Sequence, residues 1–309
     1  MTPHFQQAVI DEFRAREGRV GGPFEGGDLL LLTTVGARSG REHTVPLGYV
    51  RHDGLLLVVA SAGGAPRHPA WYHNLLAHPM VRVETGTDAF GAVAVPAEGE
   101  RRERLFEQVL RVAPGYGDYR ARTTRVLPVV ALERSEPERP AGTREVTSLA
   151  DKLTEVHTWL RAQLRHVRAE SDAHFAARAA HRGPGRAPLP GLGLQLRQHC
   201  LAFCESLEFH HTSEDAHLFP ALAQRHPQLR DVIDRLRDEH RTVARLRREL
   251  LALLAGADTA EPQRFRAELD RMTRELTTHL DHEEVSLLPA LTGIPFPPVP
   301  PSPEAAPSP

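Results

Sequence analysis

The run HHTSEDAHLFP at residues 210–220 decides the fold of half of this chain, because it returns in similar form as HLDHEEVSLLP at residues 279–289. Each run has a histidine, a glutamate four residues later and a proline ten residues after the histidine. Residues four apart lie on one face of a helix, so each run presents an imidazole and a carboxylate side by side. One such pair is most often a solvated surface pair, but two copies in one sequence frame favour a metal site.

The chain around these two runs has a helical pattern. From about residue 148 to 290 the strand signals end, and apolar residues recur at spacings of three and four. Segments rich in glycine and proline separate the helical stretches. The pattern predicts an all-α, up-and-down four-helix bundle, with helices near residues 149–178, 192–224, 228–255 and 261–287.

A lone histidine stands upstream of each run, His157 before the first and His240 before the second. Burying a single imidazole or carboxylate in an apolar bundle core is costly, whereas several at matching depth can share a metal ion. Two glutamates can bridge two metal ions while histidines occupy the terminal positions, and manganese or zinc could fill a similar site. The residues therefore predict a two-metal centre with the ligands His157, His210, Glu214, His240, His279 and Glu283.

The order H, HxxxE…P, H, HxxxE…P resembles the hemerythrin-like (HHE cation-binding) domain over roughly residues 148–290. The resemblance implies a non-haem di-iron centre, with the residues just named as iron ligands. Such a centre binds oxygen or a related diatomic molecule, or senses iron or redox state.

One position departs from that family pattern. Hemerythrins use a fifth histidine one turn after the ligand of the third helix, and this chain has Ala244 there. His211, next to a ligand, is the favoured replacement, and His217, seven residues after His210, is the alternative. The missing ligand argues against simple reversible oxygen carriage.

The first part of the chain, residues 1–135, has a different pattern. Short runs rich in valine, leucine and threonine are bounded by glycine, aspartate or proline, which is typical of strands joined by turns. Several strands with few helices between them predict a small barrel rather than a doubly wound sheet. The expected strands lie at 29–35, 43–51, 55–61, 80–85, 90–97 and 127–133, and the expected helices near 3–17, 69–77 and 99–112. Residues 136–147 are expected to be a linker, and the proline-rich residues 291–309 a disordered tail.

Three segments of this first part carry candidate binding residues. The segment TTVGARSGREHTVPLGYV (33–50) has a basic turn whose guanidinium and N–H groups could bind a phosphate, although a charged hairpin turn also explains it. The segment VASAGGAPRHPAWYHNL (59–75) has adjacent glycines that allow a ligand close to the backbone. The segment PGYGDYRARTTR (114–125) places Tyr116 and Tyr119 on one side of a turn.

Together and in this order, the three segments look like the deazaflavin-dependent nitroreductase family, whose recurring phrases are TTxGxxSGR, ASxGGxPxxPAWYHNL and PxYxxY. The resemblance covers nearly all of residues 1–135. It implies a split β-barrel that binds coenzyme F-420, a deazaflavin with a phosphate-linked polyglutamate tail. Members transfer a hydride from the reduced cofactor to quinones, nitroaromatics or other electrophiles. A barrel that has lost the cofactor, or that takes FMN, is the alternative.

The same resemblance assigns roles to residues of this sequence. The basic turn and a threonine after it would hold the cofactor phosphate, the glycine-rich loop would line the deazaflavin, and the tyrosines would border the acceptor pocket. The implied cofactor-binding residues are Arg38, Ser39, Gly40, Arg41, Thr44, Ser61, Ala62, Gly63, Gly64 and Ala65. The implied residues at the reacting centre are Tyr116, Tyr119 and Ser61.

Composition limits the partners of the chain. Its 309 residues carry a formal net charge of -2, so nothing favours nucleic acid as a partner. The N-terminus has no signal-peptide pattern and no run is long enough to span a bilayer, so a cytoplasmic location is expected. Cys200 and Cys204 are too few for a disulfide framework and are expected to be reduced.

As a whole the sequence predicts an F-420-dependent oxidoreductase that reduces a small acceptor, a quinone or a nitro compound, beside a di-iron domain that binds or senses oxygen or redox state. One alternative is a di-iron sensor of oxygen, nitric oxide or iron whose barrel only binds cofactor. Another is an F-420-dependent oxygen or peroxide reductase in which electrons reach the iron. Because split barrels often pair, a homodimer is one expectation.

Overall fold

The computed structural model describes residues 3–135, 146–180, 192–256 and 260–296. Most of the predicted linker, and the predicted tail beyond residue 296, lie outside these described residues. The chain divides into two compact units, Met1–Glu138 with Arg165–Glu205, and Arg139–Leu164 with Ser206–Pro309. The predicted domain boundary at residues 136–147 stays a prediction.

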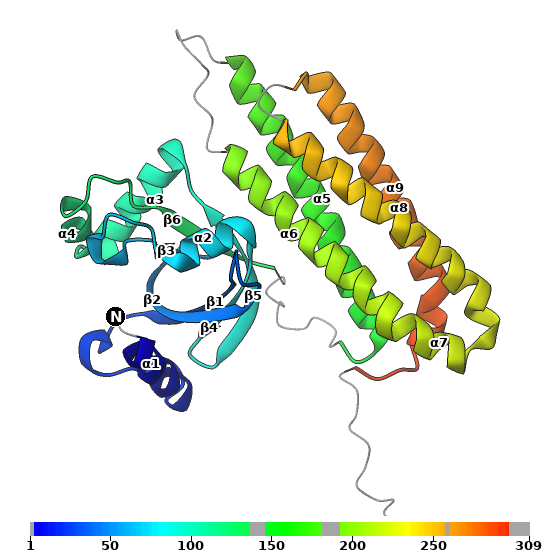
Figure 1. Cartoon of the computed structure of the whole chain (residues 1–309), viewed down its shortest axis with the longest axis horizontal. Helices are drawn as coiled ribbons and strands as arrows, with labels where there is room; N and C mark the ends of the chain where they lie inside the picture. Colours follow the sequence, from blue (N-terminus) through cyan, green and yellow to red (C-terminus); the bar gives the residue numbers. More distant parts are fainter. Residues whose placement is uncertain (1–2, 136–145, 181–191, 257–259, 297–309) are drawn as a thin grey trace, which may run out of the picture. The chain divides into compact units, whose positions relative to one another are not determined.

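Antiparallel strands close into a barrel in the order β1-β2-β3-β6-β5-β4 (Figure 1). Strands that follow one another in the chain pair, except β3 and β4. Instead β3 pairs with β6 and β1 pairs with β4, and these two pairings close the barrel. Closure leaves no strand edge open to pairing with another chain. The predicted barrel is confirmed, and its strands are β1 (Leu29–Val35), β2 (Glu42–His52), β3 (Leu55–Val59), β4 (Met80–Thr85), β5 (Asp88–Pro96) and β6 (Val129–Arg134).

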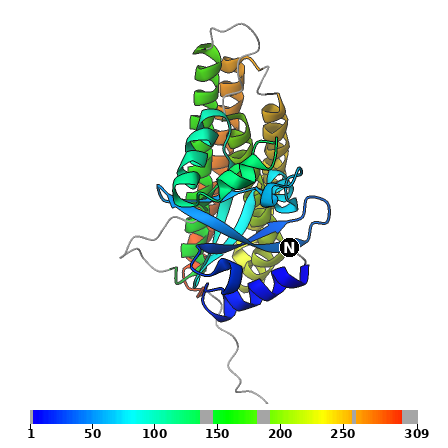
Figure 2. The ribbon, with the colours of Figure 1, turned by 90° about the vertical axis from the view of Figure 1, so that its left-hand side faces the viewer.

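Strand β1 is buried on both of its faces. Leu30 and Leu32 belong to the cluster inside the barrel, whereas Leu29 and Leu31 pack against helix α1 (Pro3–Ala15) on the outside. Side chains alternate along a strand, so four consecutive leucines cover both faces. This explains why a run without polar alternation is a strand, and why α1 lies along the barrel wall (Figure 2).

Short helices complete the barrel. Trp71 and Leu75 of α2 belong to the interior cluster, so α2 covers one opening of the barrel. Phe106 and Val109 of α3 pack on the outer faces of β3 and β6 in a separate cluster. The predicted helices are confirmed to within two residues as α1, α2 (Ala70–Ala77) and α3 (Gly99–Val112). The short α4 (Tyr116–Ala121) lies where the sequence indicated only a turn.

Four long helices lie side by side in both views of the second part of the chain (Figures 1 and 2). They confirm the predicted all-α domain. The helices are α5 (Leu149–Ala180), α6 (Leu192–Ser213), α8 (Arg230–Ala255) and α9 (Pro262–Leu291), with the short α7 (Phe219–Arg225) after α6.

Two prolines interrupt the backbone hydrogen bonds of this domain with different results. Pro220 follows a π-helical turn, Glu214–Leu218, that separates α6 from α7. Proline has no N–H and cannot continue the ladder of helical bonds, so a wider turn absorbs the mismatch. Pro289 instead lies inside α9, which continues to Leu291. The single helix predicted over 192–224 is therefore two helices joined by a π turn.

An apolar cluster lies beside that π turn. Phe219 of α7, Leu236 of α8 and Leu287 of α9 are all completely buried in it, and Leu153 of α5 joins them. The cluster fixes the depth at which these helices meet. Across the described ranges, no helix combines the length and the apolar character that crossing a bilayer requires.

The barrel contains a buried arginine whose removal tests how the barrel wall is held. Arg102 is 7% exposed, and its Nε and Nη2 donate to the Leu127 carbonyl at 3.0 and 2.7 Å. We expect Arg102→Met to lower the free energy of unfolding by about 1–3 kcal/mol, because the carbonyl is left buried without a donor. Urea unfolding of the barrel measures this. Arg104→Met, an exposed change on the same helix, should stay within about 0.5 kcal/mol of wild type, and equal losses in both variants would contradict the assignment.

Candidate metal centre and cofactor site

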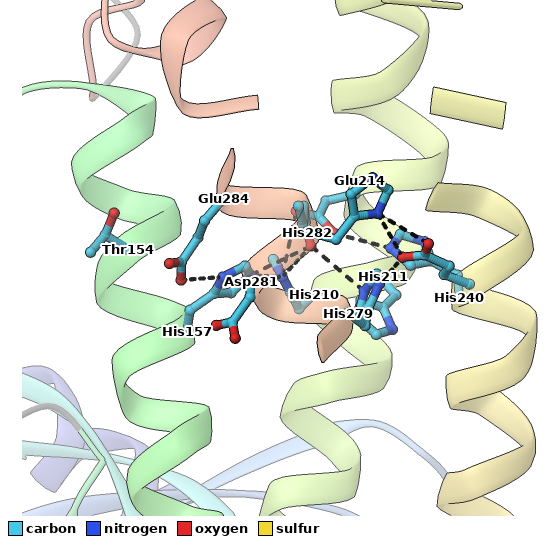
Figure 3. Close-up of polar contacts among 12 residues, drawn as sticks. Thr154, His157, His210, His211, Glu214, His240, His279, Asp281, His282 and Glu284 are labelled. Atoms are coloured by element: carbon cyan, nitrogen blue, oxygen red, sulfur yellow. Dashed lines mark hydrogen bonds and ion pairs between the residues drawn. The ribbon is translucent and has the colours of Figure 1, made fainter. Parts of the chain in front are cut away.

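Imidazole and carboxylate groups converge inside the helical domain from four helices (Figure 3). One comes from α5, three from the end of α6 and the π turn, one from α8 and two from α9. Nearly all of their surface is buried. This cluster unites every metal ligand that the sequence predicts: His157, His210, His211, Glu214, His240, His279 and Glu283.

The imidazoles form two sets. His157 Nε2 lies 3.0 Å from His210 Nε2. In the second set His211 Nε2 lies 3.2 Å from His279 Nε2, with a ring nitrogen of His240 within 4.8 Å of both. Two ligands at right angles on one ion, with metal–nitrogen bonds of about 2.1 Å, stand about 3.0 Å apart. The spacing within each set therefore fits one metal ion.

The two glutamates lie between the two sets. Glu283 Oε2 is 3.5 Å from His157 Nε2 and 3.7 Å from His279 Nε2. Glu214 reaches both sets as well, with Oε1 3.5 Å from His210 Nε2 and Oε2 3.6 Å from His240 Nε2. Each carboxylate thus contacts at least one imidazole of each set, a position from which it could bridge two metal ions.

The charge state of the cluster suits a cation. Burial lowers the pKa of His210 to about 3 and the pKa of His211 well below its ordinary value, so both rings stay neutral and keep a lone pair. Burial raises the pKa of Glu214 well above its ordinary value, and the Glu283 carboxylate raises it further, so Glu214 favours its neutral form until a cation beside it offsets both effects.

Several of these polar atoms are also orphaned. Both carboxylate oxygens of Glu214 and of Glu283, and Nε2 of His240, have no hydrogen-bond partner among the described residues. Leaving such groups buried without a partner is costly. A set of imidazoles and carboxylates with orphaned donor atoms fits iron, manganese or zinc.

A second layer of carboxylates orients the ligands. The Nδ1 atoms of His157, His240 and His279 lie 2.8, 3.1 and 3.0 Å from a carboxylate oxygen. Each contact places the proton on Nδ1 and leaves Nε2 free for a metal. The partners are Glu284, Asp215 and Glu239. The sequence analysis missed all three, although Asp215 and Glu284 each directly follow a predicted ligand glutamate.

The structure separates the two candidates for the extra ligand. The His211 ring stacks on His240 with centroids 4.0 Å apart, inside the cluster. His217 is exposed and outside the cluster. A π-helical turn begins three residues after His211, and such turns are frequent at functional sites. Ligation by His211 itself stays a prediction.

In the barrel, the predicted phosphate-binding turn joins β1 to β2. Gly40 has a φ of +63°, a conformation that favours glycine, and it allows the tight reversal. Arg38 and Arg41 beside it are exposed and form no ion pair with any described residue. Asn74 of α2 fixes the turn, because its Oδ1 accepts from Ala37 N at 3.1 Å and its Nδ2 donates to Thr34 Oγ1 at 3.1 Å. Asn74 belongs to the segment at residues 59–75, but its role depends on contacts with residues 37 and 34, which are distant in the chain.

The predicted deazaflavin loop has an unusual backbone. Ala62, Gly63 and Gly64 all have positive φ, at 47°, 65° and 85°. A Cβ added to Gly63 would meet nothing within 4 Å, so this side of the loop is open. A Cβ added to Gly64 would lie 3.1 Å from the Tyr119 carbonyl oxygen, so α4 closes the other side. The loop can therefore receive a flat ligand on one side only.

The other predicted residues lie at the edges of these loops. The Tyr116 and Tyr119 rings meet edge to face with centroids 5.7 Å apart, and burial raises the pKa of Tyr116. Ser61 is nearly buried, at 9% exposure. Thr44 Oγ1 lies 2.8 Å from Thr33 Oγ1, so its hydroxyl already has a partner. Ser61 and the two tyrosines thus lie around the glycine-rich loop, and α2 connects this loop to the basic turn.

Comparisons with known proteins agree with both halves. Residues 6–134 match the model of the F420H(2)-dependent quinone reductase family, and residues 148–291 match the hemerythrin HHE cation binding domain. An F420H(2)-dependent quinone reductase of Mycobacterium tuberculosis is 40% identical over 126 residues, which cover 40% of this chain and 85% of the relative. A putative F420H(2)-dependent quinone reductase of Mycobacterium bovis matches with the same values. A solved structure of an F420-H2 dependent reductase is 39% identical, with a TM-score of 0.33, and covers 34% of this chain and 94% of the other.

Substitutions of two histidines that are close in the chain, His211 and His217, test the metal centre. We expect His211→Ala to weaken iron binding at least about tenfold, because even the loss of an outer partner of a ligand costs that much. The measurement is iron per chain after anaerobic loading with ferrous salt and competition with a chelator. His217→Ala is the matched control, since this ring is exposed and outside the cluster. Full iron content in His211→Ala would remove this residue from the ligand set.

Proposed function

The chain belongs to the F420H(2)-dependent quinone reductase family and carries a hemerythrin HHE cation-binding domain, and from this premise we propose that its barrel transfers a hydride from reduced F-420 to a quinone, nitroaromatic or similar acceptor. On the same proposal, the helical domain holds two iron ions and binds oxygen or a related diatomic molecule. The observation that carries the barrel's role is the 40% identity to quinone reductases over most of their length.

The residues of the barrel fit an anionic, ring-bearing cofactor. Arg38 and Arg41 present two exposed guanidiniums, the group that binds phosphate best because its planar fork pairs with two oxygens. The loop from Ala62 to Gly64 has its backbone in the left-handed region, and a Cβ at Gly63 would meet nothing within 4 Å, so a ligand could approach the backbone there. When bound, F-420 supplies the hydride chemistry.

The protein's own contribution is to position and to hold protons. Burial raises the pKa of Tyr116, so its Oη keeps its proton at neutral pH. That proton is directed at the Gly48 carbonyl, 3.5 Å away, and on this proposal it would turn to the oxygen of an acceptor. Tyr119 limits where the acceptor ring lies, since its ring stands at 82° to that of Tyr116. Ser61, at the start of the loop, is proposed as a contact to the reacting edge of the cofactor.

The metal ligands support a centre with unequal ions. Three imidazoles belong to one set and two to the other, while both glutamates reach both sets. The ion near His157 and His210 would therefore have fewer protein ligands than its neighbour. Small molecules bind where a metal keeps an open position, so the proposed diatomic molecule would bind at this ion.

Two single substitutions separate the two halves of the proposal. We expect Arg41→Ala to weaken F-420 binding about tenfold or more through loss of a charged phosphate contact, with the metal content unchanged. His210→Ala should lose metal and keep its F-420 affinity. Fluorescence titration measures the affinity and elemental analysis the metal. Arg111→Ala, at an exposed position of α3, is the control for lost charge, and wild-type F-420 affinity in Arg41→Ala would contradict the phosphate assignment.

The destination of the electrons is tested by mixing reduced F-420 with the ferric protein in the absence of oxygen. We expect the cofactor to stay reduced until a quinone is added, because a deazaflavin prefers two-electron transfer and each iron accepts one electron. Deazaflavin fluorescence and iron absorption are followed together. Changes of both in step, without a quinone, would replace the proposal with an internal electron path that ends at iron.

A further inference from the structure

The glycine-rich loop of the barrel is held in a conformation that its own contacts hardly secure. Ala62 has a φ of +47°, which a residue with a Cβ seldom adopts, and two glycines with positive φ follow it. Within the loop, Gly64 N donates to Ser61 O at 2.9 Å and Ala65 N to Ala62 O at 3.1 Å. These two bonds span a few residues and do not tie the loop to the barrel.

Just before the loop, Ala60 N donates to Pro128 O at 2.9 Å, and one guanidinium supplies the further connections. Arg125 lies between α4 and β6, far from the loop in sequence. Its Nε donates to the Ala65 carbonyl at 2.8 Å and its Nη2 to the Ser61 carbonyl at 2.6 Å. Its Nη1 donates to the Ala60 carbonyl at 3.0 Å. A rigid, planar group thus holds both ends of the loop at once.

The same side chain also reaches the segment that leads into α2. Arg125 Nη1 lies 3.0 Å from His68 Nδ1, so Nδ1 accepts and the imidazole is neutral. Burial and the Arg125 charge lower the pKa of His68, in agreement with that state. His68 leads into α2, and Asn74 of α2 holds the basic turn. Arg125 therefore connects, through His68 and α2, the two loops that form the proposed cofactor site.

We infer that Arg125 is a positioning residue for the cofactor, an inference that rests on the proposed function. Four of its five N–H donors are directed at the loop carbonyls and at His68. Little hydrogen-bonding capacity is left for a phosphate or a deazaflavin. The residue therefore acts through the shape of the loop, unlike Arg38 and Arg41, whose guanidiniums face solvent.

The test compares Arg125→Met and Arg125→Lys with Arg111→Met, an exposed control, in the full-length chain. We expect the Kd for F-420 to rise about tenfold or more in Arg125→Met. Lysine should recover little, because one ammonium cannot reach three carbonyls. With reduced F-420 and a quinone, KM for the cofactor should rise in the same proportion while kcat at saturation changes less.

Millimolar guanidinium should restore affinity to Arg125→Ala beyond the effect of the same concentration of potassium chloride.

A second readout is independent of the cofactor. Hydrogen exchange of the Gly64 and Ala65 amides should be at least about tenfold faster in Arg125→Met, with exchange in β1 unchanged. If the wild type binds no F-420, the proposed function is wrong, and so is the role of Arg125 toward the cofactor. Faster exchange of these amides in Arg125→Met would then still show that Arg125 holds the loop. If wild type binds F-420 and Arg125→Met binds equally well with unchanged exchange, the inference itself is overturned. Lack of rescue by guanidinium would likewise count against it.

Discussion

The burial of seven imidazole and carboxylate side chains in one apolar helix core is the constraint on which the helical domain depends. Away from water, the imidazole lone pairs and the carboxylates need partners. The oxygens of Glu214 and Glu283 have no hydrogen-bond partner among the described residues, so the protein alone does not provide these partners there. Four helices must deliver these groups to one depth. The apolar cluster around Phe219 and Leu287 fixes that depth, and the π turn before Pro220 accommodates the helix that carries three of the seven.

The barrel depends on a different constraint, because its loops have no apolar core of their own to fix their backbone conformation. β1 is fixed by burial on both faces, and the turn after it is then placed by Asn74. The glycine-rich loop follows β3 and leads into α2, so both candidate loops refer to the same helix. Polar contacts from outside the loops, by Asn74 and Arg125, replace the apolar packing that secures the strands.

Much of this organisation could be predicted from the sequence, for identifiable physical reasons. The side chains of the buried cluster could be named in advance because helical spacing pairs His279 with Glu283 on one face and because burying such groups is costly unless they share a partner. The π turn was missed because helical periodicity records which residues are apolar and not where the backbone widens. Arg125 and Glu239 were missed because their roles depend on contacts between residues distant in the chain. Asp215 and Glu284 were within reach, since an acid follows each ligand glutamate.

The two candidate sites would hold their ligands in opposite ways, and this bears on how they could work in one chain. Around Arg38 and Gly63 the donors lie at an open surface, where a charged cofactor can enter and leave in each cycle. Around Glu283 nearly all of the donor surface is buried, so an ion would exchange mainly when the helices open. On the proposed function, a diffusing carrier of two electrons would meet the first site, while the second would keep its ions through many turnovers. Such a chain would reduce its acceptor continuously, and its metal centre would change state only when a small molecule reaches it.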